Sequence, residues 1–168
     1  MKRNIKMKGI PARVTGAELK KGDKAPDFTL VGNALNPVKK SDFEGRVLVI
    51  SCVPSLDTPV CDVETRRFNV EADKLPGDVV VLTVSRDLPF AQSRWCAASG
   101  VSKVVTVSDY RDFGFARDYG VLLSELGLLT RAIFVIDGQG IIQYIQFVEE
   151  VTQEPDYKTV LQEIKKLM

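Results

Sequence analysis

The sequence predicts an α/β fold in which helices flank a mixed β-sheet. Residues 46–53, RVLVISCV, form a near-continuous apolar run, as expected for a strand that is buried on both faces. Between this run and residue 137, strand patterns alternate with helix patterns, which is typical of a layered α/β protein. The turn sequence DGQG then leads into IIQYIQFV, and this arrangement predicts a hairpin. A hairpin added to the alternating region makes the expected sheet a mixed one.

The individual elements follow in order along the chain. Residues 1–45 are punctuated by glycine and proline, so we expect short strands and turns there, with a β-hairpin extension at the N-terminus. The patterns then predict helices at 59–75, 88–99 and 112–119, strands at 46–53, 79–85, 103–107 and 131–137, and, after the hairpin, a final helix in PDYKTVLQEIKKL. No linker interrupts the sequence, so we expect a single domain over residues 1–168.

The composition is that of an ordinary globular protein, with no feature that favours binding to nucleic acid or a membrane. Hydrophobic residues make up 45% and charged residues 27%, and the net charge of +1 comes from scattered basic residues. No apolar run is long enough to cross a bilayer. The charged start, MKRNIKMKGIPARV, lacks the apolar region of a signal peptide. We therefore expect a cytoplasmic enzyme or binding protein.

The chain has three cysteines, Cys52, Cys61 and Cys96, and no histidine. Three cysteines are too few for a scaffold held by disulfides, and their spacing matches no zinc motif. Without histidine, every metal site that needs an imidazole and every imidazole base is excluded by composition. In a reducing cytosol a disulfide is more often transient and catalytic than structural.

Cys61 lies at the expected start of a helix, in PSLDTPVCDVETRRFN. Thr58 is a good N-cap and Pro59 suits the first helical position, so Cys61 is the third residue of the helix. The N–H groups of this turn have no intrahelical partners and favour a thiolate over a thiol. A helix terminus contributes only about 0.3–1 kcal/mol, and about 2 kcal/mol at most. A second cation is therefore needed, and an arginine is the best candidate.

Two other interpretations of Cys61 stay open from the residues alone. Cys61, Phe68, Ala72 and Leu75 fall on one stripe of the helix, so Cys61 could be a buried structural cysteine. The spacing from Cys61 to Arg67 is also that of the cysteine phosphatases. That phosphate-binding loop needs converging N–H groups, however, and here the segment contains no glycine and carries acidic residues that would repel phosphate.

The other two cysteines are expected in different environments. On the helix LPFAQSRWCAASG, the apolar residues Ala91, Trp95 and Ala98 are expected to face the core, which leaves Cys96 on a polar, exposed face. An exposed thiol is a liability in a soluble protein unless it has a use. Cys52 lies inside the buried strand, so we expect it to be structural.

Several of these motifs resemble the peroxiredoxins. PSLDTPVC carries the P-x-x-x-T-x-x-C pattern of that family, with Pro54, Thr58 and Cys61 in place. DLPFAQSRWC, residues 87–96, is similar to the segment of the second cysteine in the atypical two-cysteine branch, the bacterial thiol peroxidases. LTRAIFVID is similar to the strand that supplies the active-site arginine, here Arg131, and TQEPDY is also similar. The resemblance covers nearly the full length, with one departure: Cys52 is an extra cysteine.

The resemblance implies a thioredoxin-like fold and a peroxidase that reduces hydrogen peroxide and organic hydroperoxides. Cys61 would become a sulfenic acid, Cys96 would condense with it to an intramolecular disulfide, and thioredoxin would reduce that disulfide. Arg131 would supply the missing cation and, with Thr58, hold the peroxide oxygens, while Pro54 would shape the loop and shield Cys61 from water. The resemblance also implies a homodimer that needs no metal and no organic cofactor.

A second hypothesis comes from a different functional class. A redox sensor or binding module could keep the same scaffold and pass its disulfide to a partner without turning over peroxide. The complete set of Pro54, Thr58, Cys61 and Arg131 argues against this hypothesis, because a sensor has no need to orient a peroxide.

Overall fold

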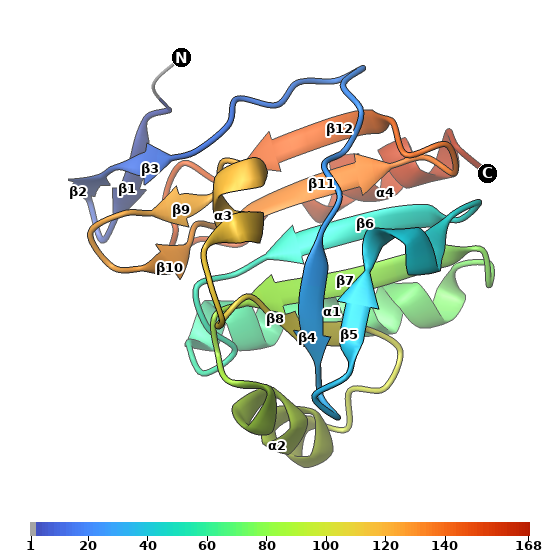
Figure 1. Ribbon diagram of the computed structural model, residues 1–168, viewed down its shortest axis with the longest axis horizontal. Coiled ribbons are helices and arrows are strands. Elements are labelled where there is room, and N and C mark those ends of the chain that lie inside the picture. Colours follow the sequence, from blue (N-terminus) through green and yellow to red (C-terminus); the bar gives the residue numbers. More distant parts are fainter. Residues whose placement is uncertain (1–2) are drawn as a thin grey trace.

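The computed structural model describes residues 3–168, and its centre is a seven-stranded mixed sheet (Figure 1). The strand order is β12-β11-β6-β7-β8-β4-β5. The three parallel strands are β6 (Val47–Cys52), β7 (Val79–Ser85) and β8 (Val105–Ser108). The antiparallel strands are β11 (Ala132–Ile136), β12 (Ile142–Phe147), β4 (Thr29–Gly32) and β5 (Pro37–Lys39). The predicted mixed sheet is confirmed.

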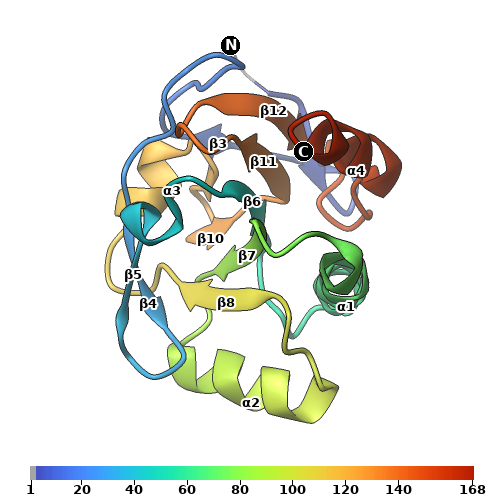
Figure 2. The same ribbon diagram turned by 90° about the vertical axis from the view of Figure 1, so that its right-hand side faces the viewer.

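Helices cover both faces of this sheet (Figure 2). α1 (Pro59–Lys74) and α4 (Tyr157–Lys165) lie together on one face, and α3 (Gly114–Asp118) lies on the opposite face. α2 (Pro89–Ser99) lies beyond β8, at one end of the sheet, and a short 3-10 helix (Lys40–Phe43) follows β5. α1 and α2 are the crossovers between parallel strands, so both begin at the same edge of the sheet.

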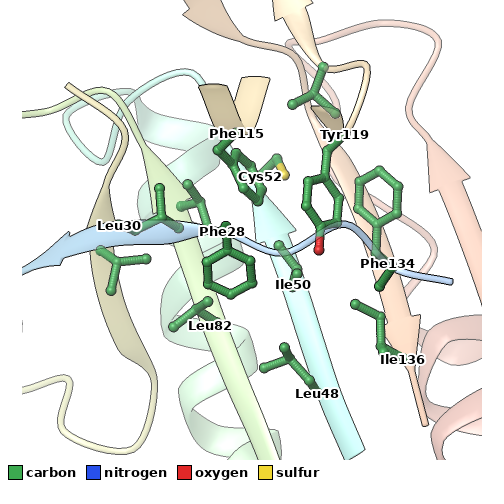
Figure 3. Close-up of a cluster of buried hydrophobic side chains, with 14 of the residues drawn as sticks. Phe28, Leu30, Leu48, Ile50, Cys52, Leu82, Phe115, Tyr119, Phe134 and Ile136 are labelled. Atoms are coloured by element: carbon green, nitrogen blue, oxygen red, sulfur yellow. The ribbon is translucent and has the colours of Figure 1, made fainter. Parts of the chain in front are cut away.

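The core has two layers because β6 is buried on both sides. All six of its residues are buried, and successive side chains point to opposite faces. On the α3 face, Leu48, Ile50 and Cys52 pack into the aromatic cluster of Figure 3, whose labelled members also include Phe28, Leu30, Leu82, Phe115, Tyr119, Phe134 and Ile136. On the other face, Val47 and Val49 pack with residues of α1 and α4. This double burial explains the near-continuous apolar run at residues 46–53.

Two small sheets lie outside the large one. The N-terminal hairpin of β1 (Ile5–Met7) and β2 (Ile10–Ala12) is confirmed. Its two turn residues, Lys8 and Gly9, have φ angles of 52° and 77°, as the twist of a tight hairpin requires. A three-stranded sheet of β3 (Val14–Thr15), β9 (Leu122–Leu123) and β10 (Leu128–Leu129) was not predicted, because two-residue strands carry no readable periodicity.

The expected orientation of α2 is confirmed for Trp95, which packs against core residues, and is wrong for the residues around it. Gln92 is fully buried, Ala98 is exposed, and Cys96 is half-buried rather than exposed. Gln92 can face inward because its amide Nε2 donates hydrogen bonds to Ser85 Oγ at 2.9 Å and to the Val107 carbonyl at 2.8 Å. Polar contacts of Gln92 with neighbouring strands therefore set the orientation of this helix together with the packing of Trp95.

Candidate active site

The first turn of α1 holds Cys61 in the predicted position. Thr58 is the N-cap, and its Oγ1 accepts a hydrogen bond from the Cys61 backbone N–H at 3.3 Å. The same hydroxyl donates to the Ser55 carbonyl at 3.1 Å. Pro59 is the first helical residue, where its missing N–H removes nothing. Cys61 is thus the third residue of the helix, close to the free N–H groups of its first turn.

Antiparallel pairing of β11 with β6 brings Arg131 to Cys61. Ala132 is opposite Cys52, the last residue of β6, so Arg131 lies at the sheet edge where α1 begins. Arg131 Nη2 donates a hydrogen bond to Cys61 Sγ at 3.1 Å, and the arginine is 1% exposed. A guanidinium at this distance places a fixed positive charge and an N–H donor against the sulfur. Arg131 is therefore the second cation that the sequence predicts beside the start of the helix.

Glu64 holds Arg131 in place and was missed by the sequence analysis. Its carboxylate forms a buried ion pair with Arg131 Nη1 and accepts a hydrogen bond from Ser51 Oγ at 3.0 Å. Arg131 Nε donates to the Val151 carbonyl at 2.9 Å. The guanidinium therefore has partners on three sides. An indication was available, because Glu64 follows Cys61 by three residues and so shares its helix face.

The pKa values of this pair reflect burial and mutual attraction. Burial alone would lower the pKa of Arg131, but the nearby charges and hydrogen bonds of Glu64 and Cys61 outweigh burial, so its pKa is raised. Burial raises the pKa of the Glu64 carboxyl, and the charge and hydrogen bonds of Arg131 and Ser51 act in the opposite direction. The arginine stays charged, which is the state that supports a thiolate.

Apolar side chains enclose the sulfur of Cys61. Cys61 is fully buried and packs with Val53, Leu56 and Trp95. Pro54 is also buried and lies in the segment that joins β6 to α1. Trp95 belongs to α2, the helix that carries Cys96. This helix therefore forms part of the enclosure around Cys61. Such an enclosure keeps water from the sulfur and strengthens its interaction with Arg131.

Cys96 has its own polar partners on the other side of α2. Its Sγ lies 3.3 Å from Thr106 Oγ1 and accepts a longer hydrogen bond from Asn33 Nδ2 at 3.9 Å. Cys96 lines an open groove of about 340 Å³ that includes the turn between β4 and β5. Cys61 and Cys96 are both free thiols. The structure thus describes a reduced form in which the two sulfurs contact different groups.

The environment of Cys52 agrees with a structural role. Its side chain lies in the aromatic core near Phe115 and Tyr119 (Figure 3), and it is fully buried. Burial raises the pKa of the Cys52 thiol well above its usual range, and the charges of Glu64 and Asp109 add to this effect. A thiol that resists ionisation is a poor nucleophile.

The phosphatase interpretation is wrong. The segment from Cys61 to Arg67 is helical, and Arg67 does not reach the sulfur: its Nε donates to Glu71 at 3.3 Å, and its guanidinium lies 4.8 Å from the ring centre of Tyr157. Arg131 is the cation at Cys61. Within residues 3–168, no group of three or more cysteine, aspartate or glutamate side chains is arranged to hold a metal ion.

Comparisons with known proteins identify the family. The Redoxin family model matches residues 20–161. A thiol peroxidase of Oceanobacillus iheyensis is 50% identical over 163 residues, which cover 97% of this chain and 99% of the relative. The chain belongs to the thiol peroxidases. A second member of the family, the thiol peroxidase of Bacillus subtilis, is 49% identical over 164 residues, 98% of each chain.

The solved structures agree with this assignment to the thiol peroxidases. The crystal structure of a peroxiredoxin-like protein from Aquifex aeolicus has a TM-score of 0.92 and 41% sequence identity, and the match covers 98% of this chain and 96% of that chain. The predicted thioredoxin-like fold is confirmed, and this thiol peroxidase is a peroxiredoxin-type oxidoreductase.

Proposed function

We propose that this thiol peroxidase reduces hydrogen peroxide and organic hydroperoxides through Cys61. The observation that carries the proposal is the contact of Arg131 Nη2 with Cys61 Sγ at 3.1 Å, beside the apolar side chains of Val53, Leu56 and Trp95. The thiolate attacks the terminal peroxide oxygen, so an S–O bond forms as the O–O bond breaks. Water or an alcohol leaves after taking up a proton, and Cys61 becomes a sulfenic acid.

Thr58 and Pro54 prepare the loop for this attack. The Thr58 hydroxyl donates a hydrogen bond to the Ser55 carbonyl, and it can turn this O–H toward a peroxide oxygen while it still accepts from the Cys61 N–H. Arg131 has forked N–H donors that can bind the oxygens as charge develops on the leaving one. Pro54 restricts the backbone beside the cluster of Val53, Leu56 and Cys61 and helps to exclude water.

Cys96 completes the cycle as the resolving cysteine. Its thiolate attacks the sulfenic sulfur of Cys61, an S–S bond forms, and the hydroxyl leaves as water. Thioredoxin then reduces the disulfide, and neither a metal nor an organic cofactor takes part. The resemblance to peroxiredoxins supports thioredoxin as reductant, a homodimer and a cytoplasmic location. Within the described range, residues 3–168, no helix has the length and apolar character needed to span a membrane.

The test is peroxide consumption coupled to thioredoxin and its reductase. Wild-type protein should turn over, and Cys61→Ser should stay folded but inactive. Cys96→Ser should consume one equivalent without turnover and then over-oxidise, because its sulfenic acid is not resolved. Cys52→Ala is the matched control and should turn over normally. Substantial turnover by Cys61→Ser would contradict the nucleophile, and oxidation of the wild type without turnover would favour the sensor hypothesis.

A further inference from the structure

Asp87 lies where the loop before α1 meets the start of α2. Its Oδ1 accepts a hydrogen bond from Ser55 Oγ at 2.7 Å, and its Oδ2 accepts from the Leu56 backbone N–H and from Ser85 Oγ, both at 2.8 Å. Two of these three donors belong to the loop that leads to Cys61. A carboxylate with three short hydrogen bonds forms a strong and directional junction.

On one side, the hydrogen bonds of Asp87 continue to Cys61. The Ser55 carbonyl accepts from Thr58 Oγ1 at 3.1 Å and from the Thr58 N–H at 3.2 Å. Thr58 Oγ1 accepts in turn from the Cys61 N–H at 3.3 Å. A series of hydrogen bonds through Ser55 and Thr58, the N-cap of α1, therefore connects Asp87 to the first turn of α1.

On the other side, the network continues into α2. Ser85 Oγ accepts a hydrogen bond from Gln92 Nε2 at 2.9 Å, and Gln92 is fully buried. Gln92 precedes Cys96 by four residues, about one helical turn. The N-cap residue of α2, Leu88, provides no side-chain cap. The bond from Gln92 to Ser85 is therefore a main polar anchor at the beginning of the helix that carries Cys96.

We propose that Asp87 is a positioning residue that holds both cysteine segments, so that residues 54–62 and the start of α2 are released together. The inference rests on the proposed function, in which Cys61 and Cys96 form a disulfide although the two sulfurs contact different groups in this structure. When the loop moves, Asp87 loses its hydrogen bonds from Ser55 and Leu56. The series of hydrogen bonds that joins the loop to Gln92 is then broken at its loop end. Until then, the same junction keeps Cys61 in the geometry that attacks a peroxide.

Hydrogen exchange of the reduced full-length protein tests this coupling. In Asp87→Asn, exchange at residues 54–62 and 89–98 should rise in both segments by the same factor, about tenfold for the loss of one charge-assisted hydrogen bond. Asp137→Asn is the matched control, because Asp137 also accepts three hydrogen bonds, from Gln139, Ile141 and Gln143, in the turn between β11 and β12. A rise in only one segment, no rise, or an equal rise in the control would overturn the proposal.

A second variant keeps the test decisive if Asp87→Asn fails to fold. Ser85→Ala removes the link to Gln92 but leaves the bonds of Asp87 to the loop. Exchange should then rise at residues 89–98 and stay unchanged at 54–62. Equal rises in both segments would mean that the coupling does not pass through Ser85, and the proposal would be wrong.

Single-turnover kinetics separate positioning from a purely structural role. Fluorescence of Trp95, the one tryptophan of the chain, can follow both steps because its ring packs against Cys61. Asp87→Asn should slow the oxidation of Cys61 and speed disulfide formation, about tenfold each, whereas equal slowing of both steps would indicate a structural role alone and refute the proposal. Hydrogen exchange needs no peroxide, so it tests the junction even if wild-type turnover fails and refutes the proposed function.

Discussion

Arg131 contacts the sulfur of Cys61 and the carboxylate of Glu64 at the same time. Arg131→Met should therefore have two effects. The rate of peroxide attack should fall roughly a hundredfold or more, because a preorganised charged donor is lost. The protein should also lose about 3–5 kcal/mol of stability, because Glu64 becomes a buried charge without its partner. Stopped-flow oxidation and denaturant unfolding measure the two effects.

The double variant Arg131→Met/Glu64→Gln separates these effects. Removing the unpaired carboxylate should recover much of the lost stability, since glutamine is neutral and can still accept from Ser51. The rate should stay low, because no cation has returned to Cys61. Recovery of the rate in the double variant would contradict the role of Arg131 as the thiolate's cation.

Asp109 makes the stability of the fold depend on pH. Burial raises the pKa of its carboxyl from 3.8 to about 7, although a hydrogen bond from Ala116 and the charge of Arg86 oppose this. The native state thus holds a proton that the unfolded chain releases near pH 4. This contribution to the free energy of unfolding is fully present below about pH 4 and is lost as the pH rises through about 7.

Asp109→Asn should remove this contribution to the pH dependence. The free energy of unfolding of the variant, compared with wild type, should increase from pH 4 to pH 8 by about 1–2 kcal/mol, after allowance for partial hydration of the carboxyl. Urea unfolding at several pH values measures the difference. A constant difference across this range would show that Asp109 titrates as an ordinary exposed aspartate.

Among the helices, α2 combines the second cysteine with weak apolar anchorage. Leu88 and Phe90, at its beginning, are 52% and 67% exposed, and its inward-facing side chains include the polar Gln92 beside the partly buried Trp95 and Cys96. A helix with few buried apolar contacts opens at low cost. This explains how a helix that holds Cys96 against Thr106 in the reduced form can release it.

We therefore predict that α2 unwinds when the disulfide forms. The sulfur of Cys61 is enclosed against Arg131, whereas the sulfur of Cys96 contacts Thr106, and a disulfide needs Cα atoms within about 7 Å. Hydrogen exchange at residues 58–66 and 88–98 should be much faster in the disulfide form than in the reduced form. Equal protection in both forms would mean that bond formation needs no unwinding.

The sequence was informative where the determinants are local. The positions of Thr58 and Cys61 follow from capping rules within one turn. Arg131 came only from the resemblance, because it lies 70 residues from Cys61 and the register of β11 on β6 cannot be read from periodicity. The inward position of Gln92 was not predictable either, since its hydrogen-bond partners lie on two other strands.

For the whole molecule, the N-terminal hairpin is linked to the site through the segment that follows β12. The Lys6 N–H donates to the Glu149 carbonyl at 2.7 Å, and the Val151 N–H donates to the Lys6 carbonyl at 2.9 Å, so the N-terminal hairpin is bonded to the segment after β12. The carbonyl of Val151 accepts from Arg131. Through these links, the orientation of Arg131 depends on distant parts of the chain.

The central claim is that Cys61 and Cys96 form one redox pair and that Cys52 takes no part. Mass analysis of the peptides after one equivalent of peroxide tests it most directly. We predict a single disulfide between Cys61 and Cys96, with Cys52 recovered as a free thiol because it is buried and resists ionisation. A disulfide that contains Cys52, or oxidation that leaves Cys61 unchanged, would contradict the account.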